Sequence, residues 1–222
     1  MRVNYGHCKV SATIAPRVFA LLLAVLFFAL PARAETVRIV VVGDSLSAGY
    51  RLPPGESFPE RLQWALSNQG IDVEIIGAGV SGDTTSGGLA RLDWSVGKNV
   101  DGVILELGAN DALRGLPVDL ARKNLAAMLA RLKQRKIGVL LAGMRAPPNM
   151  GEDYQRAFDA IYPALAKQYD VALYPFFLDG VATREALNLD DGIHPNKAGI
   201  AVMVKRFLPH AKRFINTLKT TR

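Results

Sequence analysis

The sequence is poor in the two residue types that most often bind metals or form covalent crosslinks. It contains one cysteine, Cys8, and three histidines among 222 residues. Cys8 lies in an N-terminal stretch that we expect to be removed, so the mature chain has neither a disulfide nor a thiol nucleophile. The two histidines that then remain, with no cysteine beside them, offer no recognisable ligand cluster for zinc. We therefore predict a protein that uses no metal and no cofactor.

A large excess of one charge is also absent once this N-terminal stretch is set aside. The whole chain has 27 basic and 20 acidic residues. Four basic residues and no acidic ones fall within the first 34 positions, which leaves 23 basic against 20 acidic residues, a net charge of +3. The basic residues are dispersed, apart from a short group near the C-terminus that is typical of a solvated helix end. We expect no nucleic-acid partner.

Residues 1–34 have the pattern of a secretory signal peptide. A basic leader precedes an apolar run from Val18 to Leu30, and Ala32 and Ala34 then supply the small residues that a signal peptidase recognises. The apolar run is shorter than the ~20 residues needed to cross a bilayer, which disfavours the alternative of an uncleaved anchor. We predict cleavage after Ala34, no stable membrane insertion, and a mature protein that is exported and either periplasmic or secreted.

The remaining residues, 35–222, alternate short β-type runs with longer helical patterns. Short apolar runs predict buried parallel strands at residues 37–42, 73–76, 102–107, 137–142 and 171–174. Apolar residues at helical spacing, with glycine or proline at the boundaries, predict helices at residues 56–69, 84–94, 118–136, 154–169 and from 195 to about 218. This order predicts a single α/β domain with a five-stranded parallel sheet between two layers of helices.

In such a fold the reactive residues gather in the loops that follow the strands. The loop after the first predicted strand reads Gly43-Asp44-Ser45 and places a serine directly above the sheet. Ser45 is therefore a candidate nucleophile. The alternative is that Asp44 or Ser45 caps the helix that follows.

The segment before the last predicted helix supplies what a nucleophilic serine requires. A serine needs a base to take its proton, and histidine is the usual base because it titrates near neutral pH. Asp191 stands three residues before His194, within reach of its ring nitrogen, where a carboxylate fixes the imidazole. Alternatively, His194 is a loop residue before a helix that Asn196 caps. His210 falls on the last helix, and we expect it to lie exposed on the surface.

Two further loops carry hydrogen-bond donors suited to the negative charge that develops during acyl transfer. Gly82 follows the second predicted strand, and Asn110 follows the third. A glycine lets its backbone N–H approach a substrate closely, and the asparagine amide is a side-chain donor. The alternative for each is ordinary turn chemistry, in which both residue types are common.

In combination and in this order, the four blocks resemble the SGNH-hydrolase (GDSL) superfamily. The resemblance is closer still to its bacterial thioesterase I / lysophospholipase L1 / arylesterase branch, and it spans about residues 37–214. It is carried by GDSLSAGY (43–50), SGDTTSGGLARL (81–92), LELGANDALRG (105–115), FDAIYPALAKQYDVALYPFFL (158–178) and DDGIHPN (190–196). The resemblance implies a flavodoxin-like α/β/α sandwich over residues 35–222.

The resemblance also implies a role for each motif residue. It implies that Ser45 is the nucleophile, His194 the base and Asp191 the acid that orients it. It implies an oxyanion hole formed by the backbone N–H groups of Ser45 and Gly82 together with the side chain of Asn110.

The chain departs from the family pattern in two places. Ala109 follows the glycine of the third block, which is a small change. In the loop after the fourth strand, Ala146 stands where this branch often has a larger apolar residue. That loop helps form the acyl groove in relatives, so Arg145, Ala146 and Pro147 are candidate substrate contacts, but the chain-length preference of relatives is not transferred.

The function that the resemblance implies is hydrolysis of carboxylic esters through an acyl-enzyme intermediate. The substrates would be lysophospholipids, acyl thioesters, or aryl and short acyl esters, acted on by a monomer. Export disfavours cytosolic acyl-CoA as the main substrate. Two alternatives stay open: a carbohydrate O-deacetylase of the same superfamily, and a catalytically silent module that binds lipids or glycans.

Overall fold

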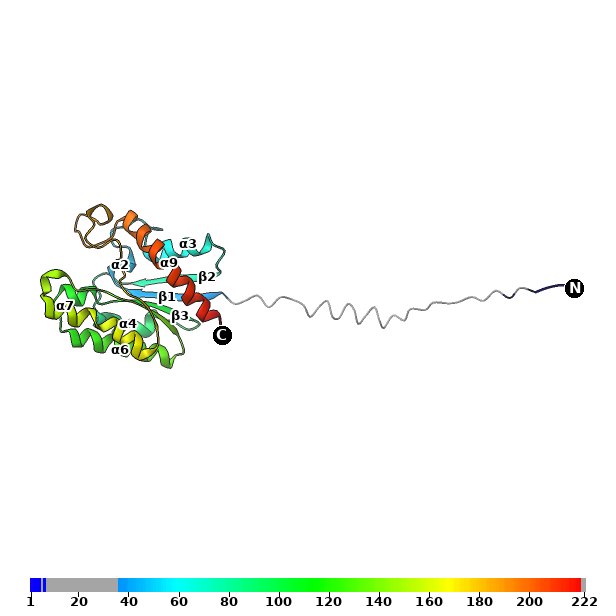
Figure 1. Cartoon of the computed structure of the whole chain (residues 1–222), viewed down its shortest axis with the longest axis horizontal. Coiled ribbons are helices and arrows are strands. Elements are labelled where there is room, and N and C mark those ends of the chain that lie inside the picture. Colours follow the sequence, from blue (N-terminus) through cyan, green and yellow to red (C-terminus); the bar gives the residue numbers. More distant parts are fainter. Residues whose placement is uncertain (5, 7–35, 221–222) are drawn as a thin grey trace. The chain divides into compact units, whose positions relative to one another are not determined.

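The structure, a computed structural model, describes residues 1–4, 6 and 36–220 (Figure 1). Apart from residues 1–4 and 6, the predicted signal peptide lies outside the described residues, as does Cys8. The described residues from Thr36 onward belong to one compact unit. Within the described part of the chain, no helix is both long enough and apolar enough to cross a membrane.

Five parallel strands form one sheet in the order β2-β1-β3-β4-β5. Their bounds are β1 (Val37–Gly43), β2 (Val73–Gly79), β3 (Gly102–Glu106), β4 (Gly138–Ala142) and β5 (Ala172–Tyr174). The central strand β3 is buried along its whole length, and β1 is buried at all positions but one. Burial on both faces explains why these strands are almost continuously apolar, and the predicted parallel sheet is confirmed.

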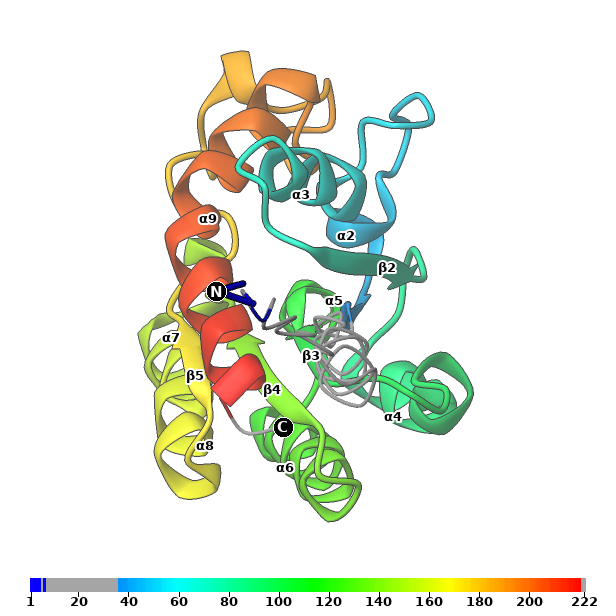
Figure 2. The same cartoon turned by 90° about the vertical axis from the view of Figure 1, so that its right-hand side faces the viewer.

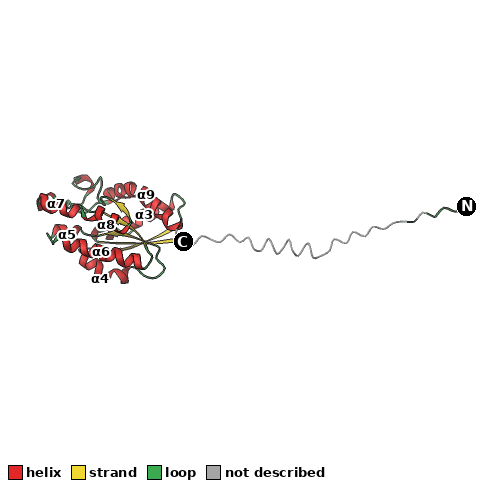
Figure 3. Cartoon of the chain, turned by 60° about the horizontal axis from the view of Figure 1, so that its bottom comes forward, coloured by secondary structure: helices red, strands yellow, loops and turns green. Residues whose placement is uncertain are grey.

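Helices cover both faces of this sheet, as Figures 1 and 2 show. Two long helices, α3 (Phe58–Ser67) and α9 (Lys197–Thr220), pack together on one face. On the opposite face lie α4 (Thr85–Ser95), α6 (Val118–Gln134) and α8 (Ile161–Tyr169). The chain therefore has the three-layer α/β/α architecture that its sequence predicts, with red helices on either side of yellow strands in Figure 3.

The apolar stripes of these helices form the two halves of the core. On α6, the residues Leu125, Met128 and Leu132 are fully buried, as their helical spacing predicts. On the other face Phe58 makes edge-to-face ring contacts with Phe177 and Phe207, at centroid distances of 4.7 and 5.2 Å. Contacts of this kind hold α3 and α9 against each other and against the sheet.

One helix prediction is wrong in its continuity. The pattern over residues 154–169 predicts one helix, but the chain forms two, α7 (Glu152–Asp159) and α8, separated at Ala160. Pro163 explains the break, because it has no N–H for the carbonyl four residues earlier and its ring crowds that carbonyl. Proline is tolerated in the first turn of α8 for the same reason, since those N–H groups have no partner within the helix.

Several short helices stand where the sequence predicts loops. They are α2 (Ser45–Ala48), α5 (Ala109–Leu113) and the 3₁₀ turns η1 (Pro148–Met150) and η2 (Glu185–Leu187). The helices α2 and α5 begin close to the carboxyl ends of β1 and β3. In the strand order 2-1-3-4-5 the chain leaves β1 in one direction and β3 in the other, which opens a crevice between their carboxyl ends.

Candidate active site

Ser45 lies on the tight turn that joins β1 to α2. The side chain of Asp44 caps α2 by accepting a hydrogen bond of 2.9 Å from the backbone N–H of Leu46. Ser45 is the first residue of α2, so its own N–H has no acceptor within the helix. The last residue of β1, Gly43, has to be glycine to pass under this turn, because a Cβ at this position would lie 2.3 Å from Ser47 Oγ. The capping alternative is therefore correct for Asp44, and this cap is what presents Ser45.

The last loop places His194 directly beside Ser45. His194 Nε2 lies 2.9 Å from Ser45 Oγ, although the two residues are 149 positions apart in the chain. On the other side of the ring, His194 Nδ1 lies 2.8 Å from Asp191 Oδ2. The three side chains thus form a continuous hydrogen-bonded line from a hydroxyl through an imidazole to a carboxylate.

Local backbone geometry explains why Asp191 holds the ring so well. Its Oδ1 accepts hydrogen bonds of 2.9 Å from the N–H groups of both Ile193 and His194. Desolvation raises the pKa of Asp191, but these two hydrogen bonds and those with the His194 ring outweigh it and lower the pKa to about 2. Asp191 is therefore ionised at any pH near neutrality. Asn196 also caps α9, through a 3.0 Å bond to Gly199 N–H, so the helix-cap alternative and the triad geometry coexist.

The ring of Tyr50 covers His194 on another side. The two ring centroids are 4.4 Å apart, with an interplanar angle of 38°.

The prediction that His210 lies exposed on the surface is wrong. His210 is half-buried against the ring of Tyr174, at 4.9 Å, because α9 lies across the sheet and turns this residue inward. Desolvation, with a contribution from the charge of Arg213, lowers the pKa of His210.

Asn110 and Gly82 follow β3 and β2, the two strands that flank β1. Asn110 belongs to the first turn of α5, and its Nδ2 donates to the backbone carbonyl of Asp83 at 2.9 Å and to Asp44 Oδ2 at 3.1 Å. Gly82 has a φ of +85°, which glycine adopts without steric cost. The structure therefore places both predicted donors in short elements that adjoin the Ser45 turn.

Two buried carboxyl groups lie beneath this turn, and the sequence-based reasoning did not identify either as part of the site. Asp44 and Glu106 are both fully buried, and Glu106 Oε2 accepts a 3.3 Å hydrogen bond from Asp44 N–H. Burial raises the pKa of Asp44 to about 7 and, with the charge of Asp44, raises the pKa of Glu106 well above its ordinary value. Each carboxylate therefore disfavours ionisation of the other. A glutamate within an apolar strand was the signal in the sequence.

A pocket with a volume of about 550 Å³ opens beside the triad. Its lining includes Ser45, Asn110 and His194, and most of the other lining side chains are apolar. The apolar lining side chains are Leu46, Ala109, Leu113, Met144, Ala146, Pro147, Pro148, Phe176, Leu178, Ala182 and Ile193. An apolar pocket with a few convergent polar groups is the usual form of a small-molecule site.

The loop after β4, which holds the candidate substrate contacts, supplies one wall of this pocket. Arg145, Ala146 and Pro147 all line it. The guanidinium of Arg145 lies 4.8 Å from the centroid of the Phe176 ring, and the Arg145 side chain is exposed. Ala146 is buried, and its N–H donates to Asp159 Oδ1 at 2.9 Å, which fixes this wall to α7. Among the described residues, no group of three or more His, Cys, Asp or Glu side chains is arranged to hold a metal ion.

Comparisons with known proteins agree with this geometry. Residues 41–202 match the model of the GDSL-like lipase/acylhydrolase family. An arylesterase of Vibrio mimicus is 45% identical over 177 residues, covering 79% of this chain and 88% of that protein. The thioesterase 1/protease 1/lysophospholipase L1 of Escherichia coli K12 is 40% identical over 167 residues, covering 75% of this chain and 78% of that protein.

A solved structure supports the same assignment at the level of the fold. The crystal structure of AlinE4, described as an SGNH-hydrolase family esterase, is 48% identical and superposes with a TM-score of 0.68. The match covers 81% of this chain and 96% of that chain. The family match spans more than half of the chain and includes Ser45, Gly82, Asn110, Asp191 and His194. The chain belongs to the GDSL-like lipase/acylhydrolase family and is a serine hydrolase of ester bonds.

Proposed function

We propose that Ser45 attacks the carbonyl carbon of an acyl ester or thioester and forms an acyl-enzyme, with His194 as its base. The single observation that carries the proposal is the hydrogen-bonded line from Ser45 Oγ through His194 to Asp191, with contacts of 2.9 and 2.8 Å, beside an apolar pocket that Ser45 and His194 line. A serine, a histidine and a carboxylate in this order form the standard apparatus of acyl transfer.

The proton of the Ser45 hydroxyl moves along the hydrogen bond between Ser45 Oγ and His194 Nε2. His194 Nε2 takes the proton of Ser45 as the oxygen attacks, and then gives it to the departing alcohol or thiol. A water molecule next loses its proton to the same nitrogen and attacks the acyl carbon, and the proton returns to Ser45 Oγ as the acid leaves. Asp191 stays ionised throughout, keeps the proton on Nδ1 and stabilises the imidazolium that forms twice in each cycle.

The oxyanion receives hydrogen bonds from the N–H groups of Ser45 and Gly82 and from Asn110 Nδ2. Both hydrogens of this amide already have acceptors, the Asp83 carbonyl at 2.9 Å and Asp44 Oδ2 at 3.1 Å. We expect the longer bond, to Asp44, to be the one shared with the oxyanion, while the bond to Asp83 keeps the amide in place. Donors fixed in advance of the reaction are what makes such a site effective.

The lining of the pocket favours acyl chains over sugars. Most of the lining side chains are apolar, and the β4 loop together with Phe176 and Leu178 supplies six of them. The exposed guanidinium of Arg145 suits a polar or anionic leaving group. We therefore propose aryl esters, short acyl esters, acyl thioesters and lysophospholipids as substrates. The polar groups that a carbohydrate deacetylase needs around its substrate are few in this lining.

The test is hydrolysis of p-nitrophenyl esters from acetate to palmitate by the mature protein and by its Ser45→Ala variant. The wild type should hydrolyse several of them, and the variant should lose about 10⁴-fold or more in kcat. Activity that survives Ser45→Ala would exclude Ser45 as the nucleophile. If the folded wild type cleaves only the acetate, the carbohydrate deacetylase becomes the better interpretation, and if it cleaves none, a silent binding module does.

Export is a second part of the proposal. It is supported by the basic leader, the apolar run and the small residues at positions 32 and 34. Expression of the full chain in a Gram-negative host, followed by mass spectrometry of the periplasmic and extracellular fractions, tests it. The expected product begins at Glu35, and a chain that keeps residues 1–34 in the cytoplasm would contradict it.

A further inference from the structure

The turn that carries Gly82 needs an external support. We call residues 80–83 the oxyanion turn. The turn is closed by a 3.1 Å hydrogen bond from Asp83 N–H to the Val80 carbonyl, and Val80 N–H donates to the Gly43 carbonyl at 3.0 Å. Gly82 occupies its third position with a φ of +85°, as in a type II turn. Glycine gives the turn this shape, but it also allows the peptide groups on either side to rotate more freely than any other residue would.

The far end of the oxyanion turn is well anchored. Arg91 Nε donates to Asp83 Oδ2 at 2.5 Å, and its NH2 group donates to the Gly43 carbonyl at 2.8 Å. Asn110 holds the Asp83 carbonyl. These contacts fix Asp83, and the turn bond to Val80 holds the N–H of the Gly82–Asp83 peptide, but none of them reaches the Gly82 carbonyl.

Arg114 supplies the missing contact. Its NH2 group donates to the Gly82 carbonyl at 2.9 Å, a charge-assisted hydrogen bond. The side chain of Arg114 is exposed, and no ion pair of the described residues involves it. An exposed arginine that satisfies a backbone carbonyl, with no carboxylate partner, contributes little to the stability of the fold.

The backbone of Arg114 is tied to the other oxyanion donor. Arg114 is the C-terminal cap of α5, and its N–H donates to the Asn110 carbonyl at 3.2 Å. The short helix is itself fixed to α4, because Asp111 accepts bonds of 2.8 and 2.6 Å from the N–H and hydroxyl of Thr85. One residue therefore connects a rigid helix that carries Asn110 with the flexible glycine that carries the second donor.

We propose that Arg114 is a positioning residue that fixes the Gly82 N–H relative to Asn110 during oxyanion stabilisation. The inference rests on the proposed function, since it requires Gly82 and Asn110 to bind the oxyanion. Arg114 touches neither the substrate nor the reacting atoms. Its effect comes from holding the Gly82–Asp83 peptide, so that the preceding peptide presents its N–H in one direction before the charge develops.

The experiment compares Arg114→Met and Arg114→Lys with wild type on p-nitrophenyl acetate. Arg114→Met should lower kcat about tenfold while KM stays within about twofold, because a misdirected donor keeps part of the effect of an aligned one. Arg114→Lys keeps a donor that reaches the carbonyl and should recover part of the loss. Arg122→Met is the matched control, because Arg122 is also an exposed arginine but lies on α6, and it should leave kcat unchanged.

Binding of a simple alkylboronic acid separates positioning from a general structural effect. The boronate forms a tetrahedral adduct on a reactive serine and places an oxygen where the oxyanion forms, so its affinity should fall in Arg114→Met by the same factor as kcat/KM. Unchanged kcat in Arg114→Met, or a rise in KM alone, would overturn the inference. Ser45→Ala run in the same series tests the proposed function separately: if it abolishes activity while Arg114→Met is fully active, only the role of Arg114 is lost.

Discussion

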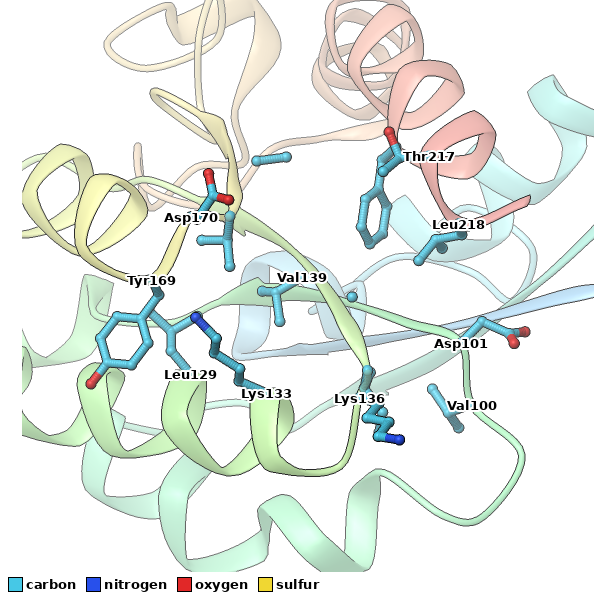
Figure 4. Close-up of a pocket in the computed structure, with 15 residues that line it drawn as sticks. Val100, Asp101, Leu129, Lys133, Lys136, Val139, Tyr169, Asp170, Thr217 and Leu218 are labelled. Atoms are coloured by element: carbon cyan, nitrogen blue, oxygen red, sulfur yellow. The ribbon is translucent and has the colours of Figure 1, made fainter. Parts of the chain in front are cut away.

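The sheet has one hollow at the carboxyl ends of its strands and another at their amino ends, which we call the carboxyl edge and the amino edge. The two hollows are similar in size. The pocket at the carboxyl edge has a volume of about 550 Å³ and contains Ser45 and His194. The hollow at the amino edge has a volume of about 460 Å³ and lies among the starts of β4 and β5 and the ends of α6, α8 and α9 (Figure 4). Lys133, Lys136 and Tyr169 line it, together with apolar side chains, and its lining contains no histidine.

The direction of the chain explains the difference. At the carboxyl edge α2, α4 and α5 begin, so their first N–H groups are available to an anion. At the amino edge α6 and α8 end, so carbonyl oxygens collect there, and lysines such as Lys133 near the end of α6 complement them. An oxyanion is stabilised by the first arrangement and repelled by the second. Size alone therefore does not identify the reactive hollow.

The sharpest test of this comparison replaces each described histidine in turn. His194→Ala should lower kcat on p-nitrophenyl acetate by about 10⁴-fold, because Ser45 then has no base. His210→Ala, which removes the half-buried histidine of α9, should leave kcat within about twofold, although it can lower the melting temperature. A comparable loss in both variants would show that the effect is not specific to the carboxyl edge.

Removal of one donor at the carboxyl edge should have the next largest effect. Asn110→Ala deletes the side-chain donor and should lower kcat about a hundredfold, the usual result for one oxyanion contact. The measurement is steady-state hydrolysis of a short ester, with circular dichroism to confirm that α5 still packs. Turnover within about threefold of wild type would remove Asn110 from the oxyanion hole.

A larger side chain in the pocket should change the chain-length profile rather than the chemistry. Ala146 is buried in the β4 wall, and Ala146→Leu places three more carbon atoms in the space beside Ser45. We expect kcat/KM for a long-chain ester to fall about tenfold, while that for the acetate changes little. An equal loss on both esters would mean that the acyl chain does not lie along this wall.

The buried acid pair gives the carboxyl edge a pH-dependent stability. Burial raises the pKa of Glu106 in the folded state above its ordinary value of 4.5. The contribution of this group to stability is therefore fully present at pH values below 4.5, and it is lost as the pH rises towards the folded-state pKa. Glu106→Gln imitates the protonated form at every pH. Its free energy of unfolding in urea should therefore fall less than that of wild type between pH 5 and 8, with the difference changing by up to about 1.4 kcal/mol per pH unit. Parallel pH profiles would contradict a raised pKa of Glu106.

The smallest effect is expected at the amino edge. Lys133→Ala and Lys136→Ala, singly or together, should leave kcat and KM within about twofold of wild type, because the hollow that they line contains no part of the triad. A fall of more than fivefold in either constant would break the comparison and assign this hollow a part in the reaction.

The sequence predicts more of the framework than of its details. All five strands were located because buried parallel strands are apolar on both faces, and the long helices because their apolar residues recur at helical spacing. The short helix α5 was not predicted, since Gly108-Ala109-Asn110-Asp111 has the composition of a turn. The division of α7 from α8 follows from Pro163, whose effect the helical spacing of the apolar residues does not reveal.

Some features of the site depend on the sequence alone because they are local. Asp191 and His194 are three residues apart, so one turn of chain brings the carboxylate both to the ring and to two backbone N–H groups. The Asp44 cap that presents Ser45 is also formed within two residues. For these contacts the residue order is sufficient, because partners two or three residues apart stay close together in any compact turn.

Only the tertiary structure decided the rest. Ser45 meets His194 across 149 positions, Asp44 meets Asn110 across 66 positions, and Arg114 reaches Gly82 across 32 positions. Parallel crossovers gather the carboxyl ends of β1, β2 and β3 at one edge, and the strand order places β1 between the other two. The same packing buries Asp44 and Glu106 together and so raises the pKa of both. Burial is a property of the assembled layers, because no single segment of this chain can exclude water from its own side chains.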